Sequence, residues 1–551
     1  MTAFLIDNMA PIMFAALVIT LLLGYPAAFS LGAVGLIFAV VGIELGQFHP
    51  DFLQALPERV YGVMNNDTLL AIPFFTFMGL VLERSGMAED LLDTIGQLFG
   101  TVRGGLAYAV IFVGALLAAT TGVVAASVIS MGLISLPIML RYGYDRRVAS
   151  GVIAASGTLA QIIPPSLVLI VMADQLGKSV GDMYEGAFIP GLVLAGLYAA
   201  YAFLISMLFP KATPGLPVEA IGFREKNGGR GLWSLGVLFI ASCAFGWLMM
   251  RGSTVTGADY VVLTMLYGIL FAFFVAVLNW IVDKLTGFRF LSAMAQQTTF
   301  VMVPPLFLIF LVLGTIFIGL ATPTEGGAMG AAGAIILGAI KRRLSWDLIR
   351  QAVESTAKLS AFVVFILVGA RVFSLTFYGV NGHVWVEHLL TSLPGGQIGF
   401  LIVVNAIVFV LAFFLDFFEL AFIVIPLLGP AAEKLGIDLI WFGVILGVNM
   451  QTSFMHPPFG FALFYLRSVA PKETYTDRVT GKRMEPVTTG QIYWGAVPFV
   501  VIQIIMVGLV IMFPAMVMHY KGAASTVDPN SVKIEIPQIE LPPLDFGQPK
   551  N

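Results

Sequence analysis

The sequence predicts an all-α polytopic membrane protein built as two related halves, and three observations support this prediction. The chain is 58% hydrophobic and only 11% charged, with a mean hydropathy of +0.94, whereas soluble domains carry about 25% charged residues. Apolar stretches of roughly 20 residues recur along it, long enough to cross a hydrocarbon core about 30 Å thick. Each half also contains a Pro-Pro pair inside an apolar segment.

The apolar stretches occupy most of the chain. Several are too long for one crossing and too short for two, so we expect roughly 12 to 15 membrane-embedded segments. The clearest stretches are 9–41, 105–140, 184–209, 258–282, 301–321, 398–415 and 490–516.

Composition also narrows the functional classes. The first Lys or Arg is Arg59, so we expect the first apolar stretch to remain as a membrane helix instead of being cleaved as a signal peptide. The single cysteine, Cys243, excludes an intramolecular disulfide framework. With a formal net charge of −3 and no basic stripe, the sequence gives no support for nucleic-acid binding.

Polar stretches divide the chain into four parts. A Pro-, Gly- and charge-rich connector begins at residue 211, and two further apolar segments follow it. A polar loop covers 471–489, and the C-terminal end is too polar and Pro-rich to fold by itself. We predict a first half at 1–210, an inserted connector with two extra helices at 211–290, a second half at 291–520 and a tail at 521–551.

An internal repeat relates the two halves. Residues 137–165 and 430–458 share four landmarks, and each landmark of the second copy lies 293 positions after its counterpart. Upstream, 24–26 (GYP) matches 321–323 (ATP) more weakly, at an offset of 297. The four landmarks are Pro137, Gly143, Asp145 and Pro164-Pro165 in the first copy, and Pro430, Gly436, Asp438 and Pro457-Pro458 in the second.

Charge separates the two copies of the repeat. The loop of the first copy is basic and the loop of the second is acidic, and basic loops tend to stay in the cytoplasm. The basic cluster at 341–343 also favours the cytoplasm. We therefore predict an inverted-topology repeat, whose halves cross the membrane in opposite senses. The loop charges are Arg141, Arg146 and Arg147 against Asp145, and Glu433 and Asp438 against Lys434.

The Pro-Pro pairs are the first candidate for a site. Two prolines end a helix, and in lipid the freed carbonyls must lie in protein or line a polar cavity. We predict paired re-entrant hairpins or broken helices that attract a cation and a carboxylate; the alternative is a pair of kinked helices with no ligand. The polar flanks are Ser156, Gly157, Thr158, Gln161 and Ser166, and Asn449, Gln451, Thr452, Ser453 and His456.

Further breaks precede each Pro-Pro segment. Residues 118–122 (AATTG) and 321–327 (ATPTEGG) interrupt apolar sequence with polar groups. Intramembrane acids are functional candidates. Glu325 is therefore either an ion ligand or a structural partner, and Asp416 and Glu419 have either a site role or a structural one. Arg371 either neutralises a carboxylate or has a structural role, and His456 is either a site residue or a packed core histidine.

The sequence lacks a phosphate-binding loop, which narrows the energy source of transport. The only Gly-Lys-Ser begins at Gly177, and Met172 stands where a phosphate-binding loop needs glycine. An ion gradient is therefore the expected driver. A membrane-embedded enzyme using His456, Asp416 or Glu419 is a weaker alternative, because no nucleophile, metal cluster or cofactor motif accompanies them.

The sequence resembles the large membrane subunit of tripartite ATP-independent periplasmic (TRAP) transporters, the DctM type, over nearly its whole length. The inserted region is similar to a longer, mannitol/chloroaromatic-like branch. Motifs that carry the resemblance are AIPFFTFMGLVLERSGMAEDL (71–91), VRGGLA (102–107), RYGYD (141–145), SGTLAQIIPPS (156–166), GAFIPGL (186–192), GLATPTEGG (319–327), FLD (414–416) and HPPFG (456–460).

This resemblance implies an elevator-type secondary transporter of the bacterial inner membrane. A periplasmic substrate-binding protein would deliver an organic anion, Na⁺ would be the coupling ion, and a small four-helix (DctQ-type) membrane subunit would complete the complex. No organic cofactor is expected. Carboxylates are the expected substrates, with 2-oxo acids and other monocarboxylates as a narrower guess. A standalone ion-coupled carboxylate transporter or antiporter is the near alternative.

Two departures from the family pattern concern the site. The usual Ser-Gly-Ser of the first break is 121–123 (TGV), and the usual Thr before the second Pro-Pro is His456. The predicted transport site, for substrate and Na⁺ together, comprises Thr120, Thr121, Gly122, Ser156, Gly157, Thr158, Pro164, Pro165, Thr322, Thr324, Glu325, Asp416, Asn449, Thr452, Ser453, His456 and Pro457.

Overall fold

The computed structural model describes residues 2–222, 229, 231–255, 257–457, 460–477 and 479–521, and within this part of the chain the predicted all-α fold is confirmed. One short strand pair, β1 (Tyr475–Thr476) with β2 (Arg483–Met484), lies in the loop before the last long helix. Residues 522–551 of the predicted tail and Pro458 lie outside the described residues.

Eight helices in the described chain are long and apolar enough to span a membrane, and two bent pairs raise this number to ten. Four shorter apolar helices, of 10 to 17 residues, are not long enough to count as spans, so the predicted number of 12 to 15 membrane-embedded segments stays a prediction. The eight are α3 (Ala27–Glu44), α8 (Val124–Arg141), α11 (Val180–Leu208), α12 (Leu232–Met250), α13 (Gly257–Thr286), α14 (Ala293–Phe317), α16 (Trp346–Gly379) and α23 (Thr489–Met512).

The bent pairs and the shorter helices complete the bundle. The first pair joins α4 (Leu56–Met64) to α5 (Ala71–Arg84) at 43°, and the second joins α17 (Gly382–Thr391) to α18 (Gly396–Leu411) at 118°. The other helices are α1 (Thr2–Asp7), α2 (Met9–Leu22), α6 (Met87–Phe99), α7 (Gly105–Thr121), α9 (Arg146–Thr158), α10 (Leu167–Leu176), α15 (Pro323–Ile340), α19 (Phe417–Ile423), α20 (Ile425–Lys434), α21 (Leu439–Met450), α22 (Phe461–Val469) and α24 (Ala515–Met518).

The two halves interlock through a reciprocal exchange of helices. Helix α3 of the first half packs along α16 of the second, while α15, the counterpart of α3, packs along α5 of the first half. Glycines allow both close approaches, as is common between helices in membranes. A Cβ on Gly35 would lie 2.9 Å from Phe373 Cα, and a Cβ on Gly327 would lie 2.9 Å from Phe74 Cβ.

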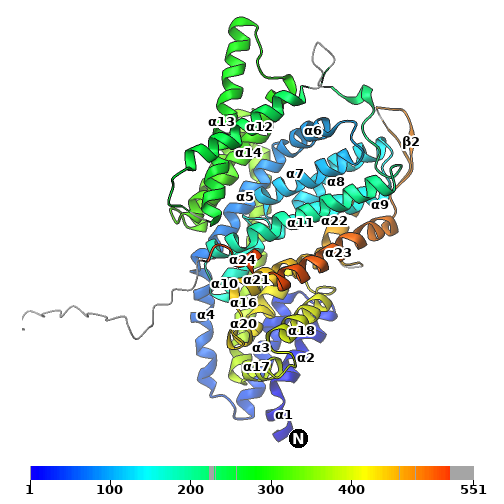
Figure 1. Cartoon of the computed structure of the whole chain (residues 1–551). Coiled ribbons are helices and arrows are strands. Elements are labelled where there is room, and N and C mark those ends of the chain that lie inside the picture. Colours follow the sequence, from blue (N-terminus) through cyan, green and yellow to red (C-terminus); the bar gives the residue numbers. More distant parts are fainter. Residues whose placement is uncertain are drawn as a thin grey trace, which may run out of the picture.

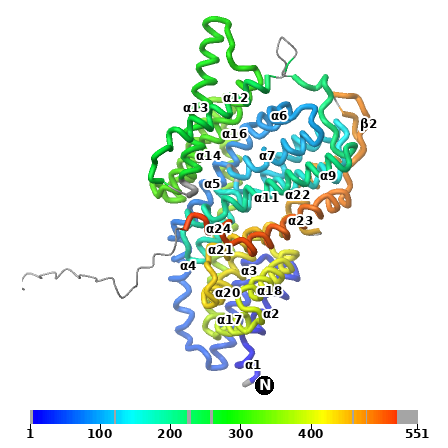
Figure 2. The backbone as a smooth tube through the Cα atoms, viewed as in Figure 1, coloured from blue at the N-terminus to red at the C-terminus, as the bar shows by residue number. Residues whose placement is uncertain are grey.

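The same exchange is found around the Pro-Pro segments. Helix α22 packs on α8, and its counterpart α10 packs on α19 and α20, the counterparts of α8. Reciprocal contacts of this kind are the signature of a two-fold relation. Figures 1 and 2 show the consequence: α6 and α7 lie toward one end of the molecule, their counterparts α17 and α18 lie toward the other, and α21 lies between.

The inserted region contributes the helices α12 and α13, which pack against each other and against α14. Their backbones approach closely at small residues: a Cβ on Gly268 would lie 2.9 Å from Ser242 O. Figure 1 shows both helices at the periphery of the bundle. The insertion therefore adds to the outside of the bundle and leaves the two-fold arrangement of the halves intact.

Candidate functional site

The first Pro-Pro segment separates two helices. Asp145 Oδ1 accepts hydrogen bonds from Arg147 N and Val148 N at the start of α9, which ends in a 3-10 turn at Leu159–Gln161. The next helix, α10, begins only after both prolines, at Leu167. Because proline donates no backbone hydrogen bond and clashes with the preceding turn, the break lies where the sequence predicts it.

Hydroxyl groups bind carbonyls around this first break. Ser166 Oγ donates to Gln161 O at 2.6 Å, and Thr158 Oγ1 donates to Ala155 O at 2.8 Å. Tyr184 Oη donates to Ser166 O at 3.4 Å. The backbone polar groups released by the break are thus partly satisfied inside the protein, as a segment surrounded by lipid and protein requires.

The second Pro-Pro segment repeats this construction. Asp438 Oδ1 accepts from Ile440 N and Trp441 N at the start of α21, a 3-10 turn covers Gln451–Phe454, and the chain restarts as α22. Thr452 Oγ1 donates to Asn449 O at 2.6 Å. In each half one helix thus ends before the Pro-Pro pair and another begins after it, as both predicted forms, re-entrant hairpins and broken helices, require.

A second break in each half meets the Pro-Pro break. In the first half α7 ends at Gly122, whose φ is +57°, and a Cβ on this glycine would lie 3.4 Å from Leu167 N and 3.6 Å from Pro165 O. The backbone of Thr120 and Thr121 belongs to the last turn of α7, and their side chains lie outside the described part of the chain. On the neighbouring turn, Gly114 and Gly157 allow α7 and α8 to approach α9.

In the second half, the break between α18 and α19 meets the Pro-Pro segment through an aromatic cluster. The ring of His456 stacks on Phe413 at 4.1 Å between centroids and lies edge-on to Phe409 at 4.4 Å. His456 thus packs in the core, while Pro457 follows it in the same turn. The two breaks are equivalent in position, but Gly122 lies against Leu167 and Pro165 in the first half, whereas His456 lies against two phenylalanine rings in the second.

One hydrogen bond joins the two Pro-Pro segments directly. Gln451 Nε2 donates to Thr158 Oγ1 at 3.0 Å, and these residues are 293 positions apart, the offset of the repeat. Gln503 Nε2, from α23, donates to Tyr198 Oη at 2.9 Å and lies 3.5 Å from Thr158 Oγ1. Equivalent positions can touch only next to the axis that relates them, so the approximate two-fold axis passes through this polar junction.

Several buried polar atoms at the junction have no hydrogen-bond partner among the described residues. A buried polar atom without a partner is uncommon and requires an explanation, such as an ion or another ligand. All of these side chains are less than 5% exposed. The atoms are Ser156 Oγ, Gln161 Oε1, Gln451 Oε1, Ser453 Oγ and Gln503 Oε1.

This donor set suits a hard cation better than a transition metal. Hydroxyl and amide oxygens are ligands of hard cations, and no group of three or more His, Cys, Asp or Glu that could hold a metal occurs in the described chain. Ser156 and Ser453 each bring one unpartnered hydroxyl from opposite halves. The junction therefore offers hydroxyl and amide oxygens from both halves, with the imidazole of His456 at the second break.

The structure places Thr322, Thr324 and Glu325 at another point. Thr322 Oγ1 and the Glu325 carboxylate form a capping box at the start of α15, and both residues are exposed. Thr324 Oγ1 donates to Asp67 O at 2.7 Å, beside the bend between α4 and α5. The carboxylate of Glu325 thus has the structural role that the sequence left open.

Asp416 and Asn449 lie near the second break. Asp416 Oδ1 accepts a hydrogen bond from Glu419 N at 2.8 Å, and Glu419 Oε2 accepts one from Asp416 N at 3.0 Å. These two bonds form a second capping box, at the start of α19. Asn449 Nδ2 donates to Asn405 O at 2.8 Å and to Asn405 Oδ1 at 2.9 Å. Sequence reasoning did not single out Asn405, although an asparagine in the apolar run 398–415 is a usable signal.

Gln503 and Tyr198 were also missed as junction residues. Each lies in a long apolar helix, and the sequence does not show which helices meet. An amide in the middle of the apolar stretch 490–516 is the signal that was available for Gln503, since polar side chains inside membrane helices usually face a partner.

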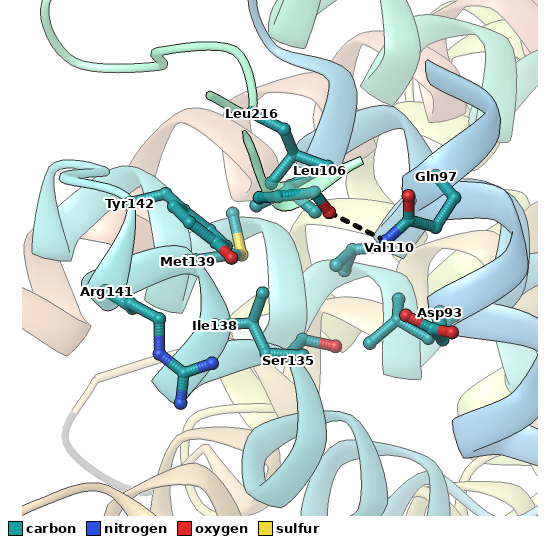
Figure 3. A pocket seen from close by; sticks show the side chains of 13 residues that line it. Asp93, Gln97, Leu106, Val110, Ser135, Ile138, Met139, Arg141, Tyr142 and Leu216 are labelled. Atoms are coloured by element: carbon teal, nitrogen blue, oxygen red, sulfur yellow. Dashed lines mark hydrogen bonds between the residues drawn. The ribbon is translucent and has the colours of Figure 1, made fainter. Parts of the chain in front are cut away.

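A cavity of about 120 Å³ lies elsewhere, beneath the connector that follows α11. It is lined in part by Asp93, Ser135 and Leu216, which Figure 3 shows. Gln97 closes it by donating from Nε2 to Ala220 O at 3.2 Å, the dashed line in Figure 3. None of the predicted site residues lines this cavity, so the connector is anchored away from the junction.

A helical membrane protein whose two halves bring broken helices together at a buried polar junction belongs to the class of membrane transport proteins. The particular family follows from comparison. The family model described as "Tripartite ATP-independent periplasmic transporter, DctM component" matches residues 14–516, and the chain belongs to this family.

Individual relatives agree with this assignment. The C4-dicarboxylate TRAP transporter large permease protein DctM of Pseudomonas aeruginosa is 26% identical over 423 residues, covering 77% of this chain and 82% of the relative. The protein of the same name from Rhodobacter capsulatus is 26% identical, with 83% and 89% covered. The isethionate TRAP transporter permease protein DctMQ of Oleidesulfovibrio alaskensis is 24% identical over 84% of this chain, which spans 60% of that longer relative.

Proposed function

We propose that this large permease subunit couples Na⁺ flow to the uptake of an organic anion, and that the polar junction is the transport site. The anion is a carboxylate, with 2-oxo acids and other monocarboxylates as the first to test. Relatives named for C4-dicarboxylates and for isethionate support the choice of a small organic anion. Broken helices provide carbonyls for cations and helix N-termini for anions.

The observation that carries this proposal is the set of unpartnered buried polar atoms on both sides of the bond between Gln451 and Thr158. These unpartnered oxygen atoms come from both halves. A Na⁺ ion there would take ligands from Ser156 on one side and from Ser453 on the other. The aromatic wall around His456 would exclude water from the second side.

The proposed assembly has three components. The family description names a tripartite, periplasmic system, which supports a periplasmic substrate-binding protein and a small four-helix membrane subunit as partners. The proposed location is the bacterial inner membrane. An elevator-type movement is the proposed mode of transport, since two-fold related halves can exchange conformations and expose the site to either side in turn.

Uptake into proteoliposomes tests this function. The purified chain, reconstituted with its small subunit and loaded binding protein, should accumulate substrate when a Na⁺ gradient is imposed. Ser156→Ala should raise the Na⁺ concentration for half-maximal uptake about tenfold, the effect of losing roughly 1.4 kcal/mol of binding free energy. The matched control is Ser242→Ala in α12, where the hydroxyl donates within its own helix to Leu238 O.

Two outcomes would overturn the proposal. Uptake that is unchanged when K⁺ replaces Na⁺ at zero proton gradient contradicts sodium coupling. Full uptake without binding protein or small subunit would instead indicate a standalone ion-coupled transporter.

A further inference from the structure

A second cavity, of about 170 Å³, lies between α4, α10, α16 and the pair α19 and α20. Its lining includes two guanidinium groups, from Arg59 on α4 and Arg371 on α16. Gln175 of α10 and Ser374 and Tyr378 of α16 supply further polar groups, and Phe422 contributes to an apolar wall. The lining therefore combines two cationic groups with apolar side chains.

The two guanidinium groups of this cavity have no ion-pair partner within the described chain. None of its lining residues is acidic, and neither Arg59 nor Arg371 forms an ion pair with another described residue. Asp174, which precedes Gln175, is already engaged: its Oδ1 accepts from Asn66 Nδ2 at 2.6 Å and its Oδ2 from Gln175 Nε2 at 2.7 Å.

Because of its position in the membrane-spanning part of the chain, the unpaired Arg371 indicates a ligand site. It lies within the spanning helix α16, eight residues before the last residue, Gly379, or about 12 Å at 1.5 Å per residue. Charged side chains in such segments face cavities or partners, and they mark ligand pathways more often than not. Guanidinium groups bind carboxylates through two parallel hydrogen bonds.

We propose that this cavity binds a small organic monoanion, with its carboxylate between Arg59 and Arg371 and its apolar part against Phe422. A cavity of about 150 Å³ can hold a molecule the size of benzene, so the volume suits one ring or a short chain. This site is distinct from the polar junction: Gln175 lies nine residues from Ser166 at the start of α10, about 14 Å along the helix.

The inference extends the proposed function, because α10 and α19 connect the cavity to the helices that form the two junctions. It does not depend on sodium coupling. Anion binding at the cavity requires neither Na⁺ nor a partner protein, so it can be measured on the purified chain alone.

The test is ¹⁹F NMR of 4-fluorobenzoate with the detergent-solubilised chain in Na⁺-free buffer. We expect line broadening that saturates with the wild-type chain and does not occur with neutral 4-fluorobenzamide. Arg371→Gln and Arg59→Gln should each weaken binding about tenfold, the loss of one charge-assisted contact. Arg371→Lys should lose less affinity, because lysine keeps the positive charge although it lacks the planar guanidinium group.

Arg103→Gln is the matched control, since Arg103 is exposed and does not line the cavity; its affinity should equal that of the wild type. Each variant is first checked for an unchanged melting temperature, and Arg59→Gln on exposed α4 keeps the test valid if Arg371→Gln unfolds. Equal affinity in the wild type and both Gln variants overturns the proposal, as does equally tight binding of the amide.

Competition with lipids distinguishes a carboxylate site from a site for a lipid headgroup. If phosphatidylglycerol displaces the probe and phosphatidylcholine does not, the cavity binds a lipid headgroup and the carboxylate assignment is wrong. Lack of displacement by either lipid supports it. Loss of Na⁺-dependent uptake with intact probe binding would reject only the proposed function, and intact uptake without probe binding would reject only this inference.

Discussion

Single residues set the points at which the broken helices begin and meet. Asp145 and Asp438 occupy equivalent positions, and each accepts two backbone hydrogen bonds at a helix start. An N-cap of this kind contributes about 1 kcal/mol. Thr158 and Gln451 then fix the contact between the halves. The repeated residues thus specify local structure, and the divergent ones specify the junction.

The bond between Thr158 and Gln451 should be measurable as an energetic coupling. Thr158→Val leaves the buried Gln451 Nε2 without its acceptor, which costs about 1–3 kcal/mol. Gln451→Leu should cost less, because Thr158 Oγ1 still donates to Ala155 O. The double variant should lose less than the sum of the two single variants. Thermal unfolding in detergent gives the double-mutant cycle, and strictly additive losses would show that the contact has no energetic role.

Asp477 should make the stability of the 471–489 loop dependent on pH. Hydrogen bonds from the Thr480 hydroxyl hold the pKa of Asp477 below its usual value, aided by the Thr480 N–H and by Arg141. Because the folded pKa is lowered, the stabilisation is present above the unfolded pKa of about 3.9 and is lost as the pH falls through the lower folded value.

Asp477→Asn should therefore lower the melting temperature at pH 7, and its difference from the wild type should shrink as the pH falls below about 4. Thr480→Val removes the main donor and should move this loss to higher pH. A difference that stays constant from pH 7 downward would contradict the assignment.

Helices were easier to predict than the contacts between them. The positions of both Pro-Pro breaks could be read from the sequence, because proline acts locally. The Thr322–Glu325 run is predicted to belong to the site because it is polar inside apolar sequence. Its Thr-x-x-Glu pattern also matches a capping box, which the structure shows, while the site role stays a prediction. Asn405 and Gln503 join the junction through tertiary packing, which one sequence does not encode visibly.

Glycine spacing controls the contact between α3 and α16. A Cβ on Gly369 would lie 2.5 Å from Ala28 O, so Gly369→Ala should force the helices apart and cost about 1–3 kcal/mol. Gly236→Ala in α12, where no atom lies within 4 Å of the added Cβ, should be neutral or stabilise by up to about 1 kcal/mol. Melting temperatures of the two variants compare the sites, and equal stabilities would argue against tight packing at Gly369.

At the scale of the whole molecule, the reciprocal contacts between α3 and α16 and between α15 and α5 make the two halves one body. Neither half buries its own faces alone. A two-fold relation by itself allows either parallel or opposite crossing of the membrane, and the loop charges are what favour opposite crossing.

The predicted inversion can be tested by labelling. Cys243 is the only cysteine, so Cys243→Ser gives a clean background for Arg147→Cys and Glu433→Cys, two exposed positions at the start of α9 and the end of α20. An impermeant maleimide should label Glu433→Cys in intact cells and Arg147→Cys only after permeabilisation. Labelling of both from the same side would mean that the halves run in parallel.

The hydrogen bond between Thr158 and Gln451 has a consequence for the origin of the chain. If the halves arose by duplication of a gene whose product paired with itself, this position once faced an identical copy of its own side chain. Two threonines or two glutamines would have shared that point. The present pair differs: threonine has a short side chain and glutamine a long one. Divergence after duplication has therefore made the centre of the molecule asymmetric and has given the two halves different polar groups there.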